Sequence, residues 1–425
     1  MLRFLDLFND TIGVLLFAAY LYQFFYTLYA LVMHRRSRQK KAPAVNTPLH
    51  RFAAIICARN EEHVIGELIS SLRAQDYPSE LLDVYVLADN CTDGTASAAR
   101  EAGATVFERF NQERVGKGFA LDYLFKRIKS SFPDKHYDAY LVFDADNLVD
   151  HGFVRAMNAT FSQGYDVLTS YRNSKNFGSS WVSACYSIWF LRESRFLNYP
   201  RMLLRTNCAI SGTGFLVSSR IIEENGGWPY FLLTEDIEFS VCCALRGWRI
   251  GYCDEAMVYD EQPVSMRQSW RQRMRWSKGF YQVNARYALK LLGGCFTGKR
   301  RFSCYDMLMT IAPCMLLTLI TVVVNLSIAA SFLFQPQFLA MLMCAAALSY
   351  VLRALVYFYV MLFFYGLLTV MVEWRKIPAK ALKKVLYLPL FPLFMFTYIP
   401  IGLAALFMRV QWKPIRHTSV ENVKV

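Results

Sequence analysis

Three groups of charged residues stand in the middle of the chain in an order that fits one reaction. They are Asp144-Ala145-Asp146, then Thr234-Glu235-Asp236, then Gln272-Arg273-Met274-Arg275-Trp276. Two carboxylates one residue apart can hold a divalent cation on a nucleotide diphosphate, and a later carboxylate can take a proton from an acceptor hydroxyl. A following arginine and tryptophan can clamp the leaving diphosphate. The combination predicts transfer of a sugar from a nucleotide donor.

The Asp-x-Asp pair is expected at the end of a strand. A short apolar run, 140–143, ends at Asp144. A sugar nucleotide carries negative charge on its diphosphate, and more develops there as the glycosidic bond breaks. One carboxylate of the pair would contact the nucleotide side, while the other holds Mg²⁺ or Mn²⁺ across the phosphates. A solvated loop acid is the alternative interpretation.

Asp236 is the candidate general base. It would take the proton from the acceptor hydroxyl as that oxygen attacks from the face opposite the diphosphate, which gives an inverted, β-linked product. Thr234 could equally cap the helix that follows, a role compatible with catalysis. We assign Glu235 to the acceptor side. Gly212 and Thr213 precede the base and are small enough to line a sugar-wide groove, although a tight turn explains them equally well.

Gln272, Arg275 and Trp276 are expected on one helical turn, with Gln272 and Arg275 on the same face. Arg275 would make a bidentate contact to the diphosphate, with Gln272 beside it on the donor side. Trp276 would form a stacking floor for the acceptor sugar or a wall of its pocket. A basic juxtamembrane helix would explain the other cations of this segment, but not its spacing after Asp236.

These motifs, together with the earlier Asp89-Asn90, resemble in order and spacing those of the membrane-bound family 2 glycosyltransferases. The resemblance is to the processive, inverting branch, which contains the cellulose, hyaluronan, chitin and poly-N-acetylglucosamine synthases, and it covers about residues 50–290. It implies an α/β nucleotide-sugar-binding domain of the glycosyltransferase A type. The donor would be a UDP-sugar, UDP-glucose or UDP-N-acetylglucosamine first, and Mg²⁺ or Mn²⁺ would be held by Asp146.

Three further donor contacts follow from this resemblance. Asp89 would contact the uridine, since a carboxylate accepts hydrogen bonds from the edges of the base and ribose. Glu61, or its neighbour Asn60, would touch the base. Lys117 lies between two glycines and matches a position near the nucleotide, where glycine permits close approach to phosphate. Asp93 is interpreted as a helix cap.

Strand and helix signals alternate over the expected catalytic domain. Apolar runs at 52–57, 84–88 and 140–143 each end in acidic or amide residues. Helical spacing follows the first run at Val64, Leu68 and Leu72. This pattern predicts a parallel α/β sheet, in which ligands bind outside the carboxyl ends of the strands.

Uncharged runs at 11–33, 307–352, 354–372 and 385–408 predict about four membrane spans, or five. Residues 338–372 could form one long span or two short ones. We divide the chain into an N-terminal anchor (1–33), a basic juxtamembrane linker (34–49), a cytosolic domain (50–290), a C-terminal transmembrane region of about three helices (303–410) and a tail (411–425).

The orientation follows from the basic residues directly after the first apolar run. Residues 34–41 are rich in Arg and Lys, so positive-inside asymmetry puts the catalytic domain in the cytoplasm. A cleaved signal peptide is disfavoured because the run is long and lacks a small-residue cleavage site. The sequence therefore predicts a multi-pass integral protein, with the plasma membrane as its expected location.

Segments 178–205 and 265–285 mix aromatic residues with arginine. We favour amphipathic helices at the bilayer interface, where Trp lies at headgroup depth and Arg pairs with phosphates, over core helices with a basic face. The net charge of +14 gathers at the membrane flanks 34–41, 299–301 and 375–384 and around the expected diphosphate site, which argues against a nucleic-acid partner.

The leading hypothesis is an enzyme that lengthens a β-glycan and threads it through its own helices. Its acceptor would be the growing glycan. Whether the chain forms a homo-oligomer is left open by the sequence. A ceramide glucosyltransferase-like enzyme that adds one sugar to a lipid is the alternative. A non-catalytic transporter or scaffold is a remote third, because we find no internal repeat and only Arg353 lies between apolar runs.

Overall fold

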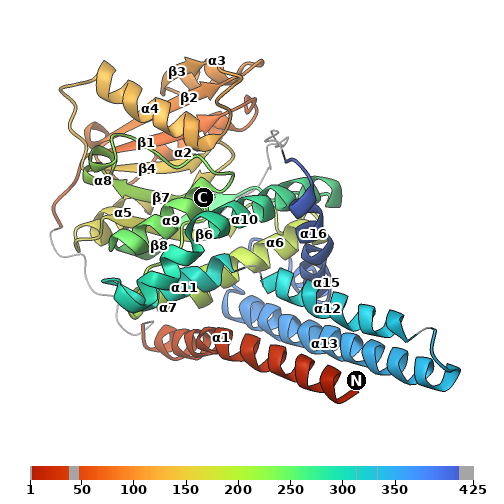
Figure 1. Cartoon of the computed structure of the whole chain (residues 1–425). Coiled ribbons are helices and arrows are strands. Elements are labelled where there is room, and N and C mark those ends of the chain that lie inside the picture. The colour runs from red at the N-terminus through yellow and green to blue at the C-terminus, as the bar shows by residue number, and fades with distance from the viewer. Residues whose placement is uncertain (1, 38–46, 313, 333, 411–425) are drawn as a thin grey trace.

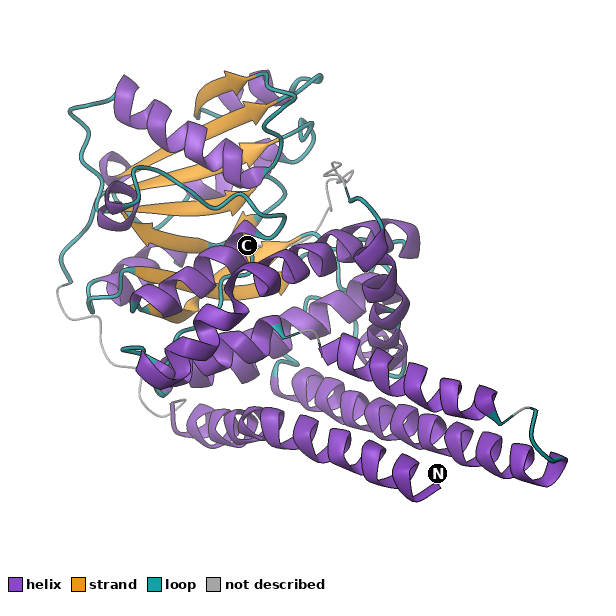
Figure 2. Cartoon of the chain, in the orientation of Figure 1, coloured by secondary structure: helices purple, strands orange, loops and turns teal. Residues whose placement is uncertain are grey.

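The computed structural model describes residues 2–37, 47–312, 314–332 and 334–410. The expected tail and residues 38–46 of the expected basic linker lie outside these ranges. A strand-rich domain occupies one end of the molecule, and long helices occupy the other (Figure 1, Figure 2). The sheet of the expected catalytic segment thus lies at the opposite end of the molecule from the long apolar helices.

One sheet organises the strand-rich domain, with its strands in the order β3-β2-β1-β4-β7-β6-β8-β5. The bounds are β1 (Phe52–Ala58), β2 (Leu82–Asp89), β3 (Thr105–Arg109), β4 (Ala139–Asp144), β5 (Leu148–Val149), β6 (Val167–Ser174), β7 (Phe215–Ser218) and β8 (Ile250–Asp260). β3, β2, β1 and β4 run parallel, β7 is antiparallel to both neighbours, β6 and β8 pair in parallel, and β5 is antiparallel to β8. The predicted parallel core is confirmed for the first four strands, whereas the whole sheet is mixed.

β1 is apolar throughout because both faces of the sheet are covered. Ala53 and Ile55 pack into one hydrophobic core, and Ala54 and Ile56 pack into the other. The first core includes helix α4 (Lys117–Ser131), and the second includes α2 (Ile65–Arg73), α3 (Thr95–Glu101) and α5 (Phe153–Phe161). The catalytic edge is therefore held between two packed helical layers.

Helices from the second half of the domain close over one end of the sheet (Figure 1). They are α6 (Trp181–Arg192), the π-helical turn η2 (Glu193–Asn198), α7 (Tyr199–Leu203), α8 (Ser219–Glu224), α9 (Glu235–Arg246), α10 (Met266–Thr297) and α11 (Arg301–Ile311). α10 packs against α9 and α11. A Cβ atom at Gly279 of α10 would lie 2.5 Å from Cγ2 of Thr234, so glycine at this position lets α10 approach the start of α9.

The remaining α-helices are α1 (Leu2–Ser37), α12 (Cys314–Ser331), α13 (Gln337–Val372), α14 (Ala381–Leu386), α15 (Leu390–Phe396) and α16 (Tyr398–Phe407). They are mostly apolar, apart from α14, which carries Lys383 and Lys384. Among the described residues three segments are long and apolar enough to cross a membrane: 3–33, 337–372 and 390–407. α13 is one continuous helix, which answers the open question over 338–372 in favour of a single long element.

The arginines of segment 178–205 are placed differently from our expectation. Arg195 and Arg201 are buried inside the protein and do not face lipid phosphates. Arg195 pairs with Glu373, and Arg201 makes a bidentate pair with Asp306, at 2.8 and 2.6 Å. α6 is buried around most of its circumference and packs against β6, α13 and α15. These contacts are those of a core helix.

Candidate active site

The predicted donor residues meet at the carboxyl ends of the parallel strands. β4 ends at Asp144 and β2 ends at Asp89. The register sets Asp144 beside Cys57 of β1, just before the loop that carries Glu61. Because parallel strands end on the same edge of a sheet, residues from separate parts of the chain converge there.

Lys117 connects this edge to the acceptor side. It is the first residue of α4, and its ammonium group pairs with the Asp144 carboxylate and donates a hydrogen bond to the Gly212 carbonyl at 2.6 Å. Burial opposes its charge, but the carboxylates of Asp144 and Glu235 outweigh that effect and raise the pKa of Lys117. Lys117 is therefore a fixed cation at the donor edge.

The glycine after Lys117 has a packing role that the sequence did not reveal. A Cβ atom at Gly118 would lie 2.0 Å from the carbonyl oxygen of Tyr230. Only glycine lets α4 approach this backbone so closely. Gly118 therefore fixes α4 against the segment before α9, in place of the phosphate contact that we expected.

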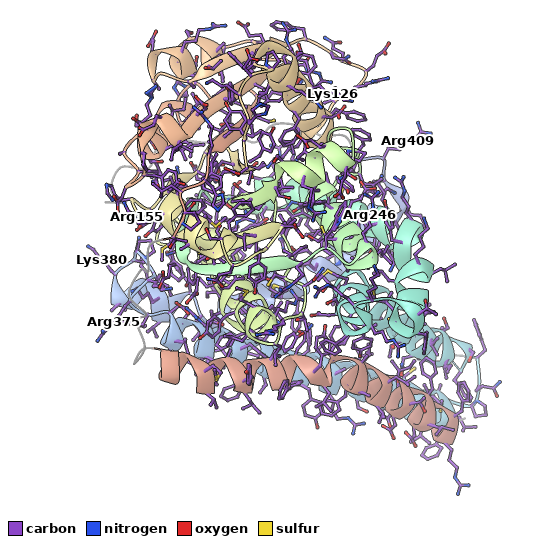
Figure 3. The ribbon with its side chains drawn as sticks, turned by 90° about the vertical axis from the view of Figure 1, so that its left-hand side faces the viewer. Lys126, Arg155, Arg246, Arg375, Lys380 and Arg409 are labelled. Carbon is purple, nitrogen blue, oxygen red and sulfur yellow. The ribbon has the colours of Figure 1, made fainter. Side chains whose placement is uncertain are left out.

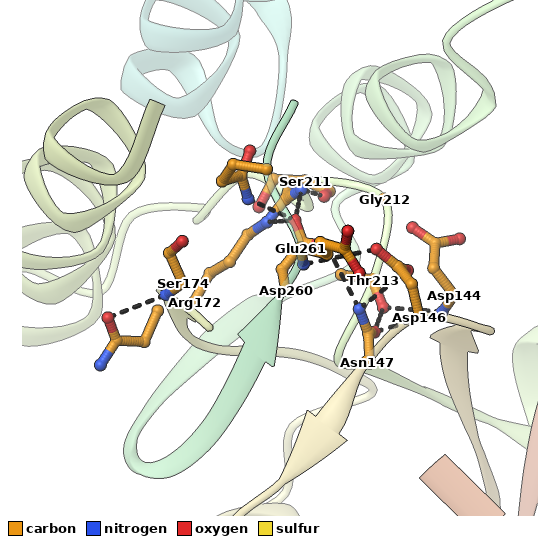
Figure 4. A network of polar contacts seen from close by, with 12 residues as sticks. Asp144, Asp146, Asn147, Arg172, Ser174, Ser211, Gly212, Thr213, Asp260 and Glu261 are labelled. Atoms are coloured by element: carbon orange, nitrogen blue, oxygen red, sulfur yellow. Dashed lines mark hydrogen bonds and ion pairs between the residues drawn. The ribbon is translucent and has the colours of Figure 1, made fainter. Parts of the chain in front are cut away.

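Asp146 is buried in a polar network just beyond the end of β4 (Figure 4). Its carboxylate accepts hydrogen bonds from the Asn147 side-chain amide at 3.4 Å and from the Glu261 backbone N–H at 3.3 Å. The Asn147 amide also reaches Asp260, at 3.4 Å. Asp146 thus stands beside a second acidic strand end, that of β8.

Thr213 belongs to this network rather than to an open groove. Its side chain is buried, and its hydroxyl accepts a hydrogen bond from the Asp144 backbone N–H at 2.9 Å and donates to Asn147. Because the Thr213 hydroxyl already makes two hydrogen bonds within the protein, we correct the expected role of Thr213 in lining the acceptor groove. The residue fixes the Asp-x-Asp segment in place.

The carboxylates at this edge fit a cation that arrives with its substrate. Among the described residues no cluster of three or more His, Cys, Asp and Glu forms a closed metal site. Mg²⁺ commonly takes one or two protein carboxylates and fills its other positions with substrate phosphates and water. Asp144 and Asp146 match that donor set, and the other donors would come from the diphosphate.

Asp89 and Glu61 lie on the nucleotide side of the edge. Asp89 is buried and accepts hydrogen bonds from Arg109 at 2.8 Å and from the Asn90 side chain at 3.3 Å. Burial raises the pKa of Asp89, against the lowering effect of Arg109. The Glu61 backbone N–H donates to the Thr95 hydroxyl at 2.8 Å, which ties the two loops together. Contacts of either carboxylate with a base stay predictions.

Asp93 lies in the turn before α3, one residue before the N-cap of this helix, which is Gly94, so the predicted cap position is off by one residue. Its carboxylate accepts hydrogen bonds from the Thr95 backbone N–H at 3.1 Å and from the Thr95 hydroxyl at 2.6 Å, directly before α3. These bonds satisfy donors at the start of the helix.

Asp236 stands in the first turn of α9, facing a glycine. A Cβ atom at Gly212 would lie 3.4 Å from Oδ2 of Asp236, and Gly212 has φ +84°, so this turn leaves space before the carboxylate. Burial raises the pKa of Asp236. Burial, and then the Asp236 charge, raise the pKa of Glu235 to about 7. The Thr234 hydroxyl makes no capping hydrogen bond, which leaves the local helix-cap interpretation without support.

α10 presents unpaired polar atoms to the same space. Within the described part of the chain, Oε1 of Gln272, Nε of Arg275 and the Thr234 hydroxyl are buried and lack a hydrogen-bond partner. Burial lowers the pKa of Arg275, although Glu235, Asp144 and Asp236 lie near enough to oppose the shift. Buried polar atoms without partners are costly, so their concentration here marks where a ligand would supply the missing bonds.

Trp276 forms a wall between α10 and α6. Its indole lies edge-on to Tyr186 at 5.8 Å and to Phe190 at 6.2 Å between ring centroids. Phe394 of α15 completes this aromatic cluster, with its ring centroid 5.0 Å from that of Tyr186. The cluster connects the candidate site to an apolar segment.

Sequence reasoning missed Arg172 and Asp260. Arg172 lies near the end of β6 and donates from Nε to Asp260 at 2.9 Å and from Nη1 to the Ser211 carbonyl at 2.6 Å (Figure 4). Burial opposes the charge on Asp260, but Arg172 outweighs it and lowers the pKa of Asp260. One signal was available, because the apolar run 256–259 ends in an acidic residue, as do the predicted donor strands.

Comparison with known proteins agrees with this geometry. Residues 50–279 match the sequence model of a protein family that is described as glycosyltransferase-like family 2. A probable glycosyltransferase of Bacillus subtilis, YdaM, is 25% identical over 287 residues, which are 61% of each chain. A β-monoglucosyldiacylglycerol synthase of Synechocystis is 24% identical, over 56% of this chain and 50% of that protein. A poly-β-1,6-N-acetyl-D-glucosamine synthase of Staphylococcus aureus is 26% identical, over 57% and 58%.

The chain therefore spans between half and about three fifths of these relatives. The matched region contains the whole sheet and every residue of the site described above except Phe394. The chain belongs to glycosyltransferase-like family 2.

Proposed function

We propose that this chain is a membrane-bound, inverting glycosyltransferase that uses a UDP-sugar to lengthen a β-linked glycan. One observation carries the proposal: the turn at Gly212 joins the donor and acceptor sides. Its carbonyl accepts a hydrogen bond from Lys117 at 2.6 Å, and its α-carbon faces Asp236. A donor diphosphate near Lys117 and an acceptor hydroxyl near Asp236 would then meet at one sugar.

On the donor side, Lys117 and Arg275 supply positive charge for the diphosphate. Asp144 and Asp146 would hold Mg²⁺ or Mn²⁺, which, when bound, neutralises charge on the leaving diphosphate. Asp89 and the Glu61 loop would orient the uridine. One relative is named as a β-monoglucosyldiacylglycerol synthase and another as a poly-β-1,6-N-acetyl-D-glucosamine synthase. These names support UDP-glucose or UDP-N-acetylglucosamine as the first donors to test.

On the acceptor side, Asp236 would remove the proton from the attacking hydroxyl. Burial raises its pKa, which makes the carboxylate a stronger proton acceptor. Arg275 and Lys117 would hold the diphosphate on the other side of the reacting carbon, so attack from the side of Asp236 inverts that carbon. An α-linked donor would then give a β-linked product.

Membrane attachment is supported by the three apolar segments and by the charges between them. Residues 373–384 contain five basic residues and contact the strand-rich domain, where Lys383 donates to the Gly178 carbonyl at 2.5 Å. Figure 3 shows Arg375 and Lys380 pointing outward between that domain and α1. Basic loops favour the cytoplasmic side, so we infer a cytoplasmic catalytic domain and a multi-pass protein, with the plasma membrane as the first location to test.

A second candidate is transfer of one sugar to a lipid. The aromatic cluster of Trp276, Tyr186, Phe190 and Phe394 favours it, because the cluster leads from the site to α15, which lies in one of the apolar segments. An acceptor that arrives from the bilayer would meet the site along this wall. The diacylglycerol-specific relative is consistent with this candidate.

Incubation of membranes that contain the chain with a panel of labelled UDP-sugars tests both candidates. Sizing of the product should reveal a long glycan that a β-specific endoglycosidase degrades, beside unused primer. A single sugar on an extractable lipid would select the second candidate. No incorporation from any UDP-sugar would contradict the proposal.

A further inference from the structure

We propose that Glu193 binds a hydroxyl group of the acceptor and so selects uncharged, hydroxyl-rich acceptors over anionic ones. This inference rests on the proposed function and extends it to the substrate class. The recognised end would be a sugar or a polyol such as glycerol. The glycan and lipid candidates share that chemistry.

The position of Glu193 on its helix directs it toward the active-site wall. Tyr186, Phe190 and Glu193 follow at the i, i+4 and i+7 spacing of one helical face, and both aromatic rings of this face contact Trp276. Tyr186 and Phe190 are buried, while Glu193 is partly exposed. Glu193 therefore lies at the end of this face, where the face becomes accessible to solvent.

A second set of contacts ties the same turn to the catalytic turn. The Arg172 guanidinium lies over the Phe190 ring, 3.7 Å from its centroid, and the Arg172 backbone N–H donates to the Ser194 hydroxyl at 3.2 Å. Arg172 also holds the Ser211 carbonyl, directly before the glycine that faces Asp236. One arginine thus connects the residues beside Glu193 to the residues beside the base.

Glu193 differs from the acids around it because it has no partner. Among the described residues its carboxylate makes no hydrogen bond or ion pair, whereas Asp260, Asp306 and Glu373 each pair with an arginine. The guanidinium groups of Arg172 and Arg201 donate instead to Asp260 and Asp306. A partly exposed carboxylate without a protein partner beside a reaction site is free to accept hydrogen bonds from a ligand.

The backbone at Glu193 supports this assignment. Residues 193–198 form a π-helical turn between α6 and α7. Such turns insert one extra residue into a helix, are uncommon, and are frequent at functional sites. Glu193 is the first residue of this turn and directly follows α6.

The chemistry of a carboxylate then defines what the acceptor must offer. An ionised carboxylate accepts hydrogen bonds and donates none, and its bonds to hydroxyl groups are short and strong. A phosphate or carboxylate at the same place on the acceptor would be repelled. The acceptor end that fits has hydroxyl groups and no negative charge.

The test compares the full-length parent with Glu193→Gln in membranes at saturating UDP-sugar. Neutral probes are octyl β-glucoside, cellobiose, chitobiose and dioctanoylglycerol, and the anionic probe is octyl β-glucoside 6-phosphate. The substitution should raise the KM of the neutral acceptor about tenfold, and the ratio of neutral to anionic turnover should fall by a similar factor. The donor KM and UDP affinity should stay within about twofold, because Glu193 lies on the acceptor side.

Glu255→Gln, an exposed acid on β8, is the matched control and should change none of these values. Thermal unfolding of each variant separates misfolding from lost recognition, and Glu193→Asp should restore part of the acceptor affinity. An active parent whose acceptor KM and charge preference are unchanged in Glu193→Gln would overturn the role of Glu193 alone. A parent that transfers to none of the neutral probes would overturn this inference and the proposed function together.

Discussion

The donor and acceptor sides of the site are built in opposite ways. On the donor side the charged groups already have protein partners: Lys117 holds Asp144, and Arg109 holds Asp89. On the acceptor side the Thr234 hydroxyl and the Glu193 carboxylate have no hydrogen-bond partner among the described residues. Oε1 of Gln272 and Nε of Arg275, on the donor side, are also unpaired and are the exceptions to this division. The strand ends of the donor side are pre-organised, whereas the acceptor side has polar groups that its substrate would satisfy.

This difference predicts which properties each side controls. Groups that hold one another need little reorganisation when the nucleotide enters, so donor binding should tolerate changes on the acceptor side. Unpaired groups gain most when a ligand arrives, so changes there should act on acceptor affinity and on turnover. The predictions below use that separation.

The largest effect is expected from Asp236→Asn, which keeps the shape of the side chain and removes the base. Transfer should fall by a factor on the order of 10² to 10⁴, while UDP binding, measured by calorimetry, should persist. Asp134→Asn, an exposed substitution, is the control. If nucleotide affinity fell in parallel with turnover, Asp236 would be a binding or folding residue and the separation of the two sides would be wrong.

Asp146→Ala addresses the donor side. Loss of this carboxylate should weaken the hold on a divalent cation and reduce transfer and donor hydrolysis by about a hundredfold or more. EDTA should do the same to the parent, and added Mg²⁺ or Mn²⁺ should restore the parent but not the variant. Full activity of the parent in EDTA would show that transfer does not need a divalent cation.

Trp276→Ala tests the acceptor wall. Loss of the indole should raise the KM of the acceptor about tenfold and shorten the product chains, because it removes an apolar surface against which a sugar can lie. UDP binding should change little. Trp374→Ala, which lies beyond the end of α13, is the control. If Trp276→Ala showed a normal acceptor KM and normal chain length, Trp276 would only pack against α6 and would not contact the acceptor.

The smallest effect concerns stability against pH. The pKa of Glu235 is raised from 4.5 to about 7, so the folded protein binds this proton more tightly than the unfolded chain. The stabilising contribution is complete below the ordinary pKa and disappears as the pH rises through about 7. Glu235→Gln should therefore flatten the pH dependence of chemical unfolding in this window by on the order of 1 kcal/mol. An unchanged slope, equal to that of the exposed control Glu80→Gln, would contradict this shift.

The donor side could be predicted from sequence because its signals are local. Asp89 and Asp144 directly follow apolar runs, and the first four parallel strands bring such ends together. The antiparallel β7 and the parallel pairing of β6 with β8 depend on contacts between distant segments, so Arg172 and Asp260 gave no joint signal. Thr213 was misassigned for the same reason, because its partner Asn147 lies far away in sequence.

The arginines of η2 and α7 illustrate a second limit. A mixture of aromatic residues and arginine is typical of a bilayer interface and of a buried ion-pair network alike. The partners decide between them, and here they lie on other elements: Asp306 of α11 for Arg201, and Glu373 after α13 for Arg195. The composition of the segment alone cannot predict which distant residues pair with its arginines.

The central claim is inverting sugar transfer from a UDP-sugar, and its most direct test follows the transferred carbon. Membranes with the parent chain receive UDP-sugar labelled with ¹³C at the anomeric carbon, and the purified product is read by NMR while UDP is counted. The account predicts one UDP released for each sugar incorporated and a β-linked anomeric carbon. An α-linked product, or UDP release with the sugar appearing only in water, would contradict it.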